Sequence, residues 1–139
     1  MKKIKFIVAI ATYNRIKYLK KAIDSVLNQK VKDNINLEIV LSNSCSSDET
    51  YSYIESLRKK KNIHIYNSND KIPENNLSQF INFENLSKTI PDDADWVWWL
   101  GDDDKVVGDN SIQIVVDTIL KNSSEDLTFI HACSARRYS

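Results

Sequence analysis

The chain has 139 residues, a length typical of a single domain, and 42% of them are hydrophobic, as in an ordinary globular protein. Its 19 basic and 19 acidic residues give no net charge, which argues against a general nucleic-acid-binding protein. Cys45 and Cys133 lack the spacing of a structural zinc site, and no apolar run approaches the roughly 18 residues of a membrane span. We therefore expect a cytoplasmic protein with free thiols, with the inner face of the membrane as an alternative location.

Apolar runs and helical periodicities alternate along the chain. Strands are predicted at 4–11, 37–42, 63–66, 95–100 and 127–133, the first two being nearly continuous runs rich in β-branched residues. Helices are predicted over 18–29, over a segment opened by a capping box of Ser46 and Glu49, over 77–88 and over 111–121. This alternation predicts an α/β fold with a mostly parallel sheet flanked by helices.

The segment 95–100, DWVWWL, is expected to be a central strand. Trp96 and Trp98 would point to one face of the sheet, and Val97 and Trp99 to the other. Because both faces are apolar, we expect helices to bury both. If this strand pairs with strand 4–11 on the side away from 37–42, the loops that follow the two strands face each other, where α/β proteins bind ligands.

Three consecutive carboxylates, Asp102, Asp103 and Asp104, follow that strand directly. Carboxylates this close raise each other's pKa unless a cation neutralises them. Oxygen ligands suit Mg²⁺ or Mn²⁺, and such sites are usually completed by substrate phosphates. A solvated acidic turn that caps the next helix is the alternative, which the position after a buried strand disfavours.

The loop after the first strand is also polar. Thr12, Tyr13, Asn14 and Arg15 offer groups that can hold a nucleotide's base or phosphate, whereas the alternative is helix capping by Thr12 or Asn14. After the second strand, the amide of Asn43 can read a base edge. We expect the other polar groups to be structural, including the basic run 58–61 as a solvated helix end and the two histidines on strands.

Three segments together resemble the N-terminal half of a family 2 glycosyltransferase with the GT-A fold. They are IVAIATYNRIKYLKKAIDSVLNQ, EIVLSNSCSSDET and WVWWLGDDD, and the resemblance covers almost the whole chain. It implies transfer of a sugar from a nucleotide-diphosphate donor, usually with inversion at the anomeric carbon. The chain is then expected to be one partial domain, 1–139, that holds the donor.

The resemblance also implies roles for single residues. Thr12, Tyr13 and Arg15 match the loop that contacts the nucleotide. Asn43 stands where the family usually has an aspartate that binds the nucleobase, which weakens the inference of a UDP-linked donor. The remaining donor-site positions are Ser78, Asn82 and the DXD motif, Asp102–Asp104.

Within that motif, Asp102 is expected towards the ribose and Asp104 on the metal, Mn²⁺ or Mg²⁺. Both enter the expected metal set, and Asp103 can share either role. Gly101 occupies a position that is often aspartate in the family, so the register is open by one residue.

The acceptor site and the general base are expected beyond Ser139, because Glu125 and Asp126 precede a predicted strand on the wrong edge of the sheet. Expected partners are a nucleotide-diphosphate sugar, UDP-linked by preference, and a saccharide or lipid-linked acceptor, but no nucleic acid. Pairing with a second copy through exposed apolar surface stays open. The alternatives are a non-catalytic nucleotide-binding or interaction module and, less favoured for want of a glycine-rich loop, a nucleotidyltransferase.

Overall fold

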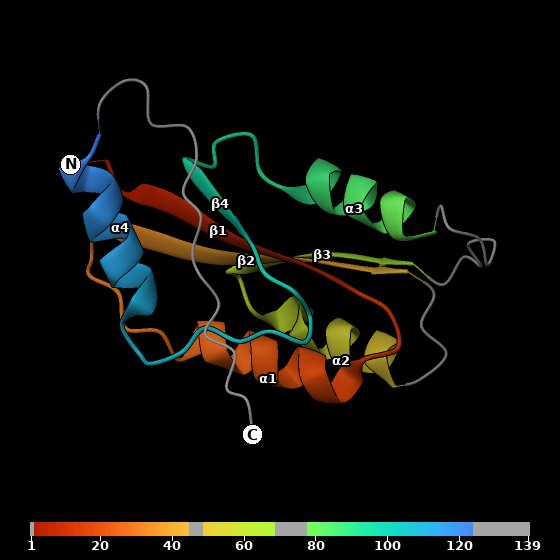
Figure 1. The fold of residues 1–139 in the computed structure, drawn as a ribbon. Helices are drawn as coiled ribbons and strands as arrows, with labels where there is room; N and C mark the ends of the chain where they lie inside the picture. Colours follow the sequence, from red (N-terminus) through yellow and green to blue (C-terminus); the bar gives the residue numbers. More distant parts are fainter. Residues whose placement is uncertain (1, 45–48, 69–77, 124–139) are drawn as a thin grey trace.

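The computed structural model describes residues 2–44, 49–68 and 78–123 of the chain. Within these ranges the elements follow each other as strands and helices in the order shown in Figure 1. The strands are β1 (Ile4–Thr12), β2 (Ile35–Ser44), β3 (Ile63–Ser68) and β4 (Trp96–Trp99). The helices are α1 (Ile16–Leu27), α2 (Thr50–Ser56) with a 3₁₀ turn η1 (Leu57–Lys59), α3 (Ser78–Thr89) and α4 (Ser111–Lys121).

The four strands form one parallel sheet in the order β3-β2-β1-β4. β4 pairs with β1 from Phe6↔Trp96 to Ala9↔Trp99, on the side away from β2. The predicted α/β fold and the predicted place of β4 are therefore confirmed. As a result, the loops after β1 and β4 leave the same edge of the sheet side by side.

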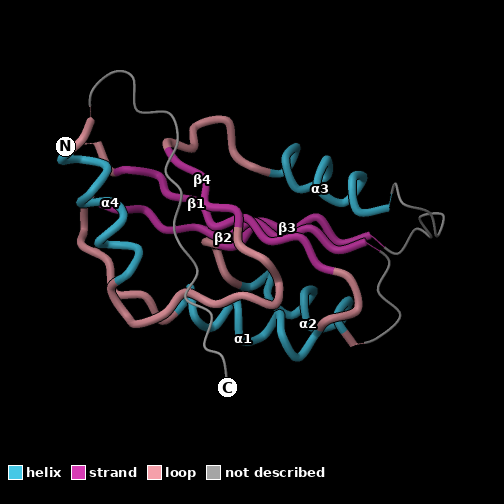
Figure 2. The backbone as a smooth tube through the Cα atoms, in the orientation of Figure 1, coloured by secondary structure: helices cyan, strands magenta, loops and turns pink. Residues whose placement is uncertain are grey.

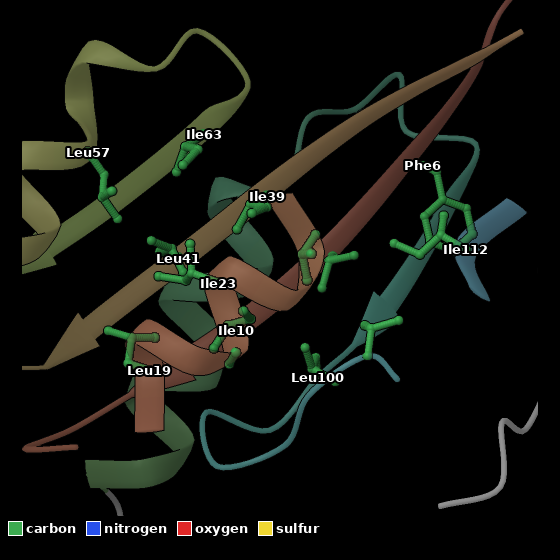
Figure 3. Packing of buried hydrophobic residues seen from close by; sticks show 14 of the residues in the cluster. Phe6, Ile10, Leu19, Ile23, Ile39, Leu41, Leu57, Ile63, Leu100 and Ile112 are labelled. Carbon is green, nitrogen blue, oxygen red and sulfur yellow. The ribbon is translucent and has the colours of Figure 1, made fainter. Parts of the chain in front are cut away.

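The main core lies between the sheet and the layer that contains α1, α2 and α4. Buried side chains from both sides meet there, among them Ile10 and Leu41 of the sheet and Ile23 of α1, each 0% exposed (Figure 3). Burying one such side chain contributes about 1.5–3 kcal/mol, so this layer supplies most of the folding free energy. α1 forms because its apolar residues recur at helical spacing, and the buried ones are Leu19, Ala22, Ile23 and Val26.

A smaller core lies on the other face of the sheet, under α3. It consists of Ile7, Ala9, Val40 and Leu86, all essentially unexposed. Figure 2 shows α3 alone on this side, opposite α1 and α2. The sheet is thus covered on both faces near the carboxyl ends of β1 and β2, and its polar loops emerge between the two helical layers.

The expectation that 95–100 is a central strand buried on both faces is wrong for the described part of the chain. β4 is an edge strand there, and its residues are only partly buried, with Trp99 49% exposed. The reason is that β4 lies at the edge of the described sheet and that α3 packs mainly on β1, β2 and β3, meeting β4 at its margin, where the ring centroids of Phe83 and Trp99 lie 6.1 Å apart. The predicted alternation is confirmed, since Trp96 and Trp98 pack on the main core and Val97 on the smaller one.

The predicted start of α2 also needs correction. α2 begins at Thr50 with Glu49 as its N-cap and without a side-chain cap, so Glu49 does not take the inner position of a capping box. Ser46 and the predicted strand 127–133 lie outside the described residues. Among the helices of the described ranges, none has the length and apolar character to cross a membrane.

Candidate functional site

The loops after β1 and β4 are joined by side-chain contacts at the carboxyl edge of the sheet. Thr12 Oγ1 donates to Asp102 Oδ2 at 2.9 Å. Arg15 Nη1 lies 3.3 Å from Asp102 Oδ1 and 3.1 Å from Asp103 Oδ2. The sequence prediction that these two loops face each other is confirmed. The contact between them places an arginine between two carboxylates.

Asp102 is buried within this contact, with 8% of its surface exposed. Burial raises the pKa of its carboxyl group, and the Thr12 hydrogen bond and the Arg15 charge oppose that rise. Both of its oxygens are bonded to neighbours. Asp102 therefore behaves as an anchored acid that fixes the start of the loop.

Asp103 and Asp104 are exposed and turn back over Gly101. A Cβ at Gly101 would lie 2.8 Å from Asp104 Oδ2 and 3.1 Å from Asp103 Oδ1. The two carboxylate oxygens therefore converge on the same small volume, where they repel each other. A side chain at position 101 would displace them, so glycine keeps this convergence available.

The converging oxygens suit a hard divalent cation. Residues 2–44, 49–68 and 78–123 contain no cluster of three or more His, Cys, Asp or Glu side chains that could hold a metal by itself. Mg²⁺-type sites, however, commonly use one or two carboxylates and take the rest from phosphates and water. The donor set fits such an ion, and the residues that would hold it are Asp103 and Asp104, whereas the sequence prediction named Asp102 and Asp104.

The other residues of the β1 loop frame this site. Tyr13 is 51% exposed, and Asn14 adopts a positive φ of 50°, which turns the chain sharply before α1. Arg15 itself is the N-cap residue of α1, and no side chain caps the helix. The capping alternative for Thr12 or Asn14 is therefore wrong.

Asn82 holds the β1 loop from the side of α3. Its Nδ2 donates to the carbonyl of Thr12 at 3.0 Å, and its Oδ1 accepts from Ser42 Oγ at 2.6 Å. It is buried, so it supports the site from behind. Ser78, the other residue expected from this segment, is the first residue of α3.

Asn43 takes part in a different network from that of Asp102. It is opposite Thr12 in the β1–β2 register and fully buried, and its Nδ2 donates to Asn67 Oδ1 at 2.7 Å. Asn67 in turn donates to Glu55 Oε1 at 2.8 Å. The structure thus brings Thr12, Arg15, Asp102 and Asp103 together, and Asn43 lies beside Thr12 in the sheet while its side chain bonds to Asn67 of β3.

The sequence prediction missed the residues that hold the far end of the acidic loop. Gln29, just after α1, donates to the carbonyl of Gly108 at 2.6 Å and accepts from the backbone N–H of Ile112 at 3.1 Å. Ser25 Oγ accepts from the backbone N–H of Val106 at 3.0 Å. The only signal in the sequence is a polar residue at the end of an amphipathic helix, which does not name a partner about 80 residues away.

Comparison with known proteins places this geometry in a family. A family model described as Glycosyl transferase family 2 matches residues 7–131. Abequosyltransferase RfbV of Salmonella typhimurium is 33% identical over 101 residues, which cover 73% of this chain and 28% of that protein. GalNAc(5)-diNAcBac-PP-undecaprenol beta-1,3-glucosyltransferase of Campylobacter jejuni is 46% identical over 55 residues, or 40% of this chain and 17% of that protein.

Solved structures share the fold. The crystal structure of S. aureus TarS 1-349 superposes with a TM-score of 0.65 at 21% identity, covering 85% of this chain and 33% of that one. TarS 1-349 in complex with UDP-GlcNAc gives a TM-score of 0.63 at 20% identity over 85% of this chain and 32% of that one. This chain therefore spans about a third or less of the length of the proteins it matches.

The parallel sheet with helices on both faces is the GT-A arrangement expected from the sequence. Because the family model covers most of the chain, and the conserved fold agrees with it, the chain belongs to glycosyl transferase family 2.

Proposed function

We propose that the chain binds a nucleotide-diphosphate sugar as the donor-binding part of a metal-dependent, inverting glycosyltransferase. The observation that carries the proposal is the joined edge of β1 and β4, where Arg15 contacts Asp102 and Asp103 and the oxygens of Asp103 and Asp104 converge. One arginine bonded to a block of three acids leaves an excess of negative charge. A bound divalent cation would neutralise that excess and the donor's diphosphate at once.

The residues of the chain would divide the work of donor binding. Asp102, fixed by Thr12 and Arg15, holds the loop in place and is suited to accept a hydrogen bond from a ribose hydroxyl. Asp103 and Asp104 would hold the metal. Tyr13 presents an exposed ring beside the same loop, where it can stack on the nucleobase.

A UDP-linked sugar is the favoured donor. The solved structures of TarS 1-349, which share the fold, include complexes with UDP and with UDP-GlcNAc. The acceptor is proposed to be a saccharide or a lipid-linked saccharide, since the names of the two curated relatives describe an abequosyltransferase and a glucosyltransferase of an undecaprenol-linked glycan. The family match favours glycosyl transfer over the nucleotidyl transfer considered from the sequence.

Isothermal titration calorimetry tests donor binding directly. The chain would be titrated with UDP-, GDP-, CDP- and dTDP-sugars, each with Mn²⁺ and with EDTA. We expect binding of at least one UDP-sugar that is strengthened by Mn²⁺. A folded chain that binds none of these donors would refute the proposal.

A matched pair of variants assigns the metal. Asp104→Ala removes one of the converging carboxylates, and Asp92→Ala removes an equally exposed aspartate away from the site. We expect the first to abolish the Mn²⁺ dependence of donor binding and the second to leave it intact. Unchanged Mn²⁺ dependence in Asp104→Ala would show that the metal lies elsewhere.

A further inference from the structure

Some lysines of the described residues form ion pairs with a carboxylate, and others do not. Five lysines near the sheet ends and on α3 lie within ion-pair distance of a carboxylate; they are Lys2, Lys5, Lys30, Lys32 and Lys88. In contrast, six lysines in α1 and in the segment that includes η1 have no carboxylate partner within the described ranges; they are Lys17, Lys20, Lys21, Lys59, Lys60 and Lys61. Lys3, Lys105 and Lys121 also lack such a partner, so six of the nine described lysines without an ion pair lie on the α1–α2 layer.

The three lysines of α1 lie on the outer surface of that layer, and the other three are exposed at the end of η1 and in the turn that follows it. Lys17, Lys20 and Lys21 are exposed and alternate with the buried stripe of α1, so they point away from the sheet. Lys20 Nζ lies 5.1 Å from the ring centroid of Tyr53 of α2, which joins the two helices on this surface. Figure 1 shows α1 and α2 side by side on the same face of the sheet.

Exposed tyrosine accompanies the positive charge. Tyr18 of α1 is 56% exposed. Amphipathic rings of this kind are enriched at membrane–water interfaces, where the phenol contacts headgroups. Lysine clusters of four to eight residues on a helical surface are typical of anionic-lipid binding.

We propose that the α1–α2 surface docks on an anionic lipid bilayer. The arguments are charge complementarity and the exposed ring of Tyr18, and the proposal goes beyond donor binding because it concerns a different face of the molecule. Arg15, at the start of α1, contacts Asp102 and Asp103, so the docked surface adjoins the candidate donor site. Docking would therefore hold that site next to the headgroup region, where a lipid-linked acceptor is presented.

Vesicle co-sedimentation tests the surface without any need for transfer activity. The chain would be mixed with phosphatidylcholine vesicles that contain or lack phosphatidylglycerol, at low and at high salt. We expect binding to the anionic vesicles only, with a loss of affinity as salt rises. Binding to neither vesicle, or equally to both, would overturn the proposal whether or not the chain binds a donor.

Two triple variants with the same change in net charge locate the surface. Lys17→Gln, Lys20→Gln and Lys21→Gln together should weaken anionic-vesicle binding at least about tenfold. Lys3→Gln, Lys88→Gln and Lys121→Gln together should change it less than about twofold, because those residues lie outside the α1–α2 layer. Equal losses of vesicle binding in the two variants would mean that only net charge matters. Binding of an oligonucleotide but not of vesicles would assign the surface to nucleic acid. Either result would overturn the proposal.

Discussion

Two polar clusters occupy opposite ends of the sheet and differ in charge balance. At the amino end, Glu38 is buried, with Asn36 Nδ2 at 2.7 Å from its Oε1 and His64 Nε2 at 2.5 Å from its Oε2. Lys5 Nζ lies 3.6 Å from Glu38 and 2.8 Å from Asp93. Each acid of this amino-end cluster therefore has a basic or neutral donor of its own.

The carboxyl-end cluster, Thr12, Arg15 and Asp102–Asp104, is unbalanced. Arg15 is shared by Asp102 and Asp103, Asp102 is buried, and Asp103 Oδ1 and Asp104 Oδ2 both lie close to Gly101. Both clusters cross neighbouring elements, and both contain a buried acid. An excess of carboxylates over donors, and not burial or clustering alone, therefore distinguishes the candidate ligand site from the amino-end cluster.

The largest expected effect is the loss of ligand binding from the carboxyl-end cluster. Asp103→Ala combined with Asp104→Ala removes both converging carboxylates and should weaken Mn²⁺-dependent donor binding about 100-fold, or roughly 2.7 kcal/mol. Calorimetry measures the change. Asp93→Ala, in the amino-end cluster, serves as the control and should leave the affinity within about twofold.

The amino-end cluster should respond in stability instead. Glu38→Ala leaves Asn36, His64 and Lys5 without their shared acceptor, so the free energy of unfolding should fall by about 1–3 kcal/mol. Urea unfolding followed by circular dichroism measures this. Donor affinity of the folded variant should stay unchanged. A loss of donor affinity without a loss of stability would contradict the structural role of the amino-end cluster.

The anchor of the acidic loop should affect both stability and binding. Gln29→Ala removes the bonds to Gly108 and Ile112 and should lower the free energy of unfolding by about 1–2 kcal/mol. Because the loop that carries Asp103 and Asp104 loses its far attachment, donor affinity should also fall several-fold.

Gln29→Glu separates the two bonds of that anchor. It keeps an oxygen acceptor for Ile112 but removes the donor to Gly108. Its stability should lie between those of the wild type and Gln29→Ala. If both Gln29 variants keep full affinity at a temperature where they are folded, the anchor is structural only.

Asp102→Asn should change stability little. Burial raises the pKa of Asp102, so its ionised form costs folding free energy, and a neutral amide of the same shape relieves that cost. Loss of the Arg15 ion pair acts in the opposite direction. We expect the free energy of unfolding to stay within about 1 kcal/mol of the wild type while donor affinity falls. A loss as large as that of Glu38→Ala would show that Asp102 is mainly structural.

The smallest effect is a difference in pH dependence between the clusters. Asp102 has a raised pKa, so the folded chain binds its proton more tightly, and the contribution of Asp102 to stability falls as pH rises from about 4 through that pKa. Asp95, beside the amino-end cluster, has a pKa lowered first by the backbone N–H of Lys5. Its contribution is present above the ordinary aspartate pKa and is lost as pH falls through the lowered value.

Urea unfolding between about pH 3 and pH 6 would resolve the two contributions. In the wild type, the contribution of Asp102 to the free energy of unfolding is lost as the pH rises, and Asp102→Asn should abolish that loss. The contribution of Asp95 is lost as the pH falls, and Asp95→Asn should abolish that loss. Shifts of the same sign in both variants would contradict the assignment.

Much of the fold was predictable because local pattern decides it. The apolar runs of β1 and β2 and the stripe of α1 match the described elements within a few residues. The burial of β4 was not predictable from WVWW, because exposure depends on which neighbours cover a strand, and α3 packs mainly on the other three strands.

The candidate site was predictable only at the level of loops. A parallel sheet places Thr12, Arg15 and Asp102 at one edge, which the strand pattern implies. Which aspartate is anchored and which pair converges depends on side-chain geometry that spacing does not encode. The pairing of Asn43 with Asn67, and of Gln29 with Gly108, joins distant segments and has no local signature.

One helix holds the acidic loop at both of its ends, through Arg15 at the start of α1 and through Ser25 and Gln29 at its end. The backbone of the loop has therefore already lost much of its conformational freedom before any ligand arrives. A donor or cation that binds Asp103 and Asp104 should find them preorganised, so that little of the binding free energy is consumed in ordering the chain. The way α1 holds the loop would then favour binding of the proposed ligand by only two protein carboxylates.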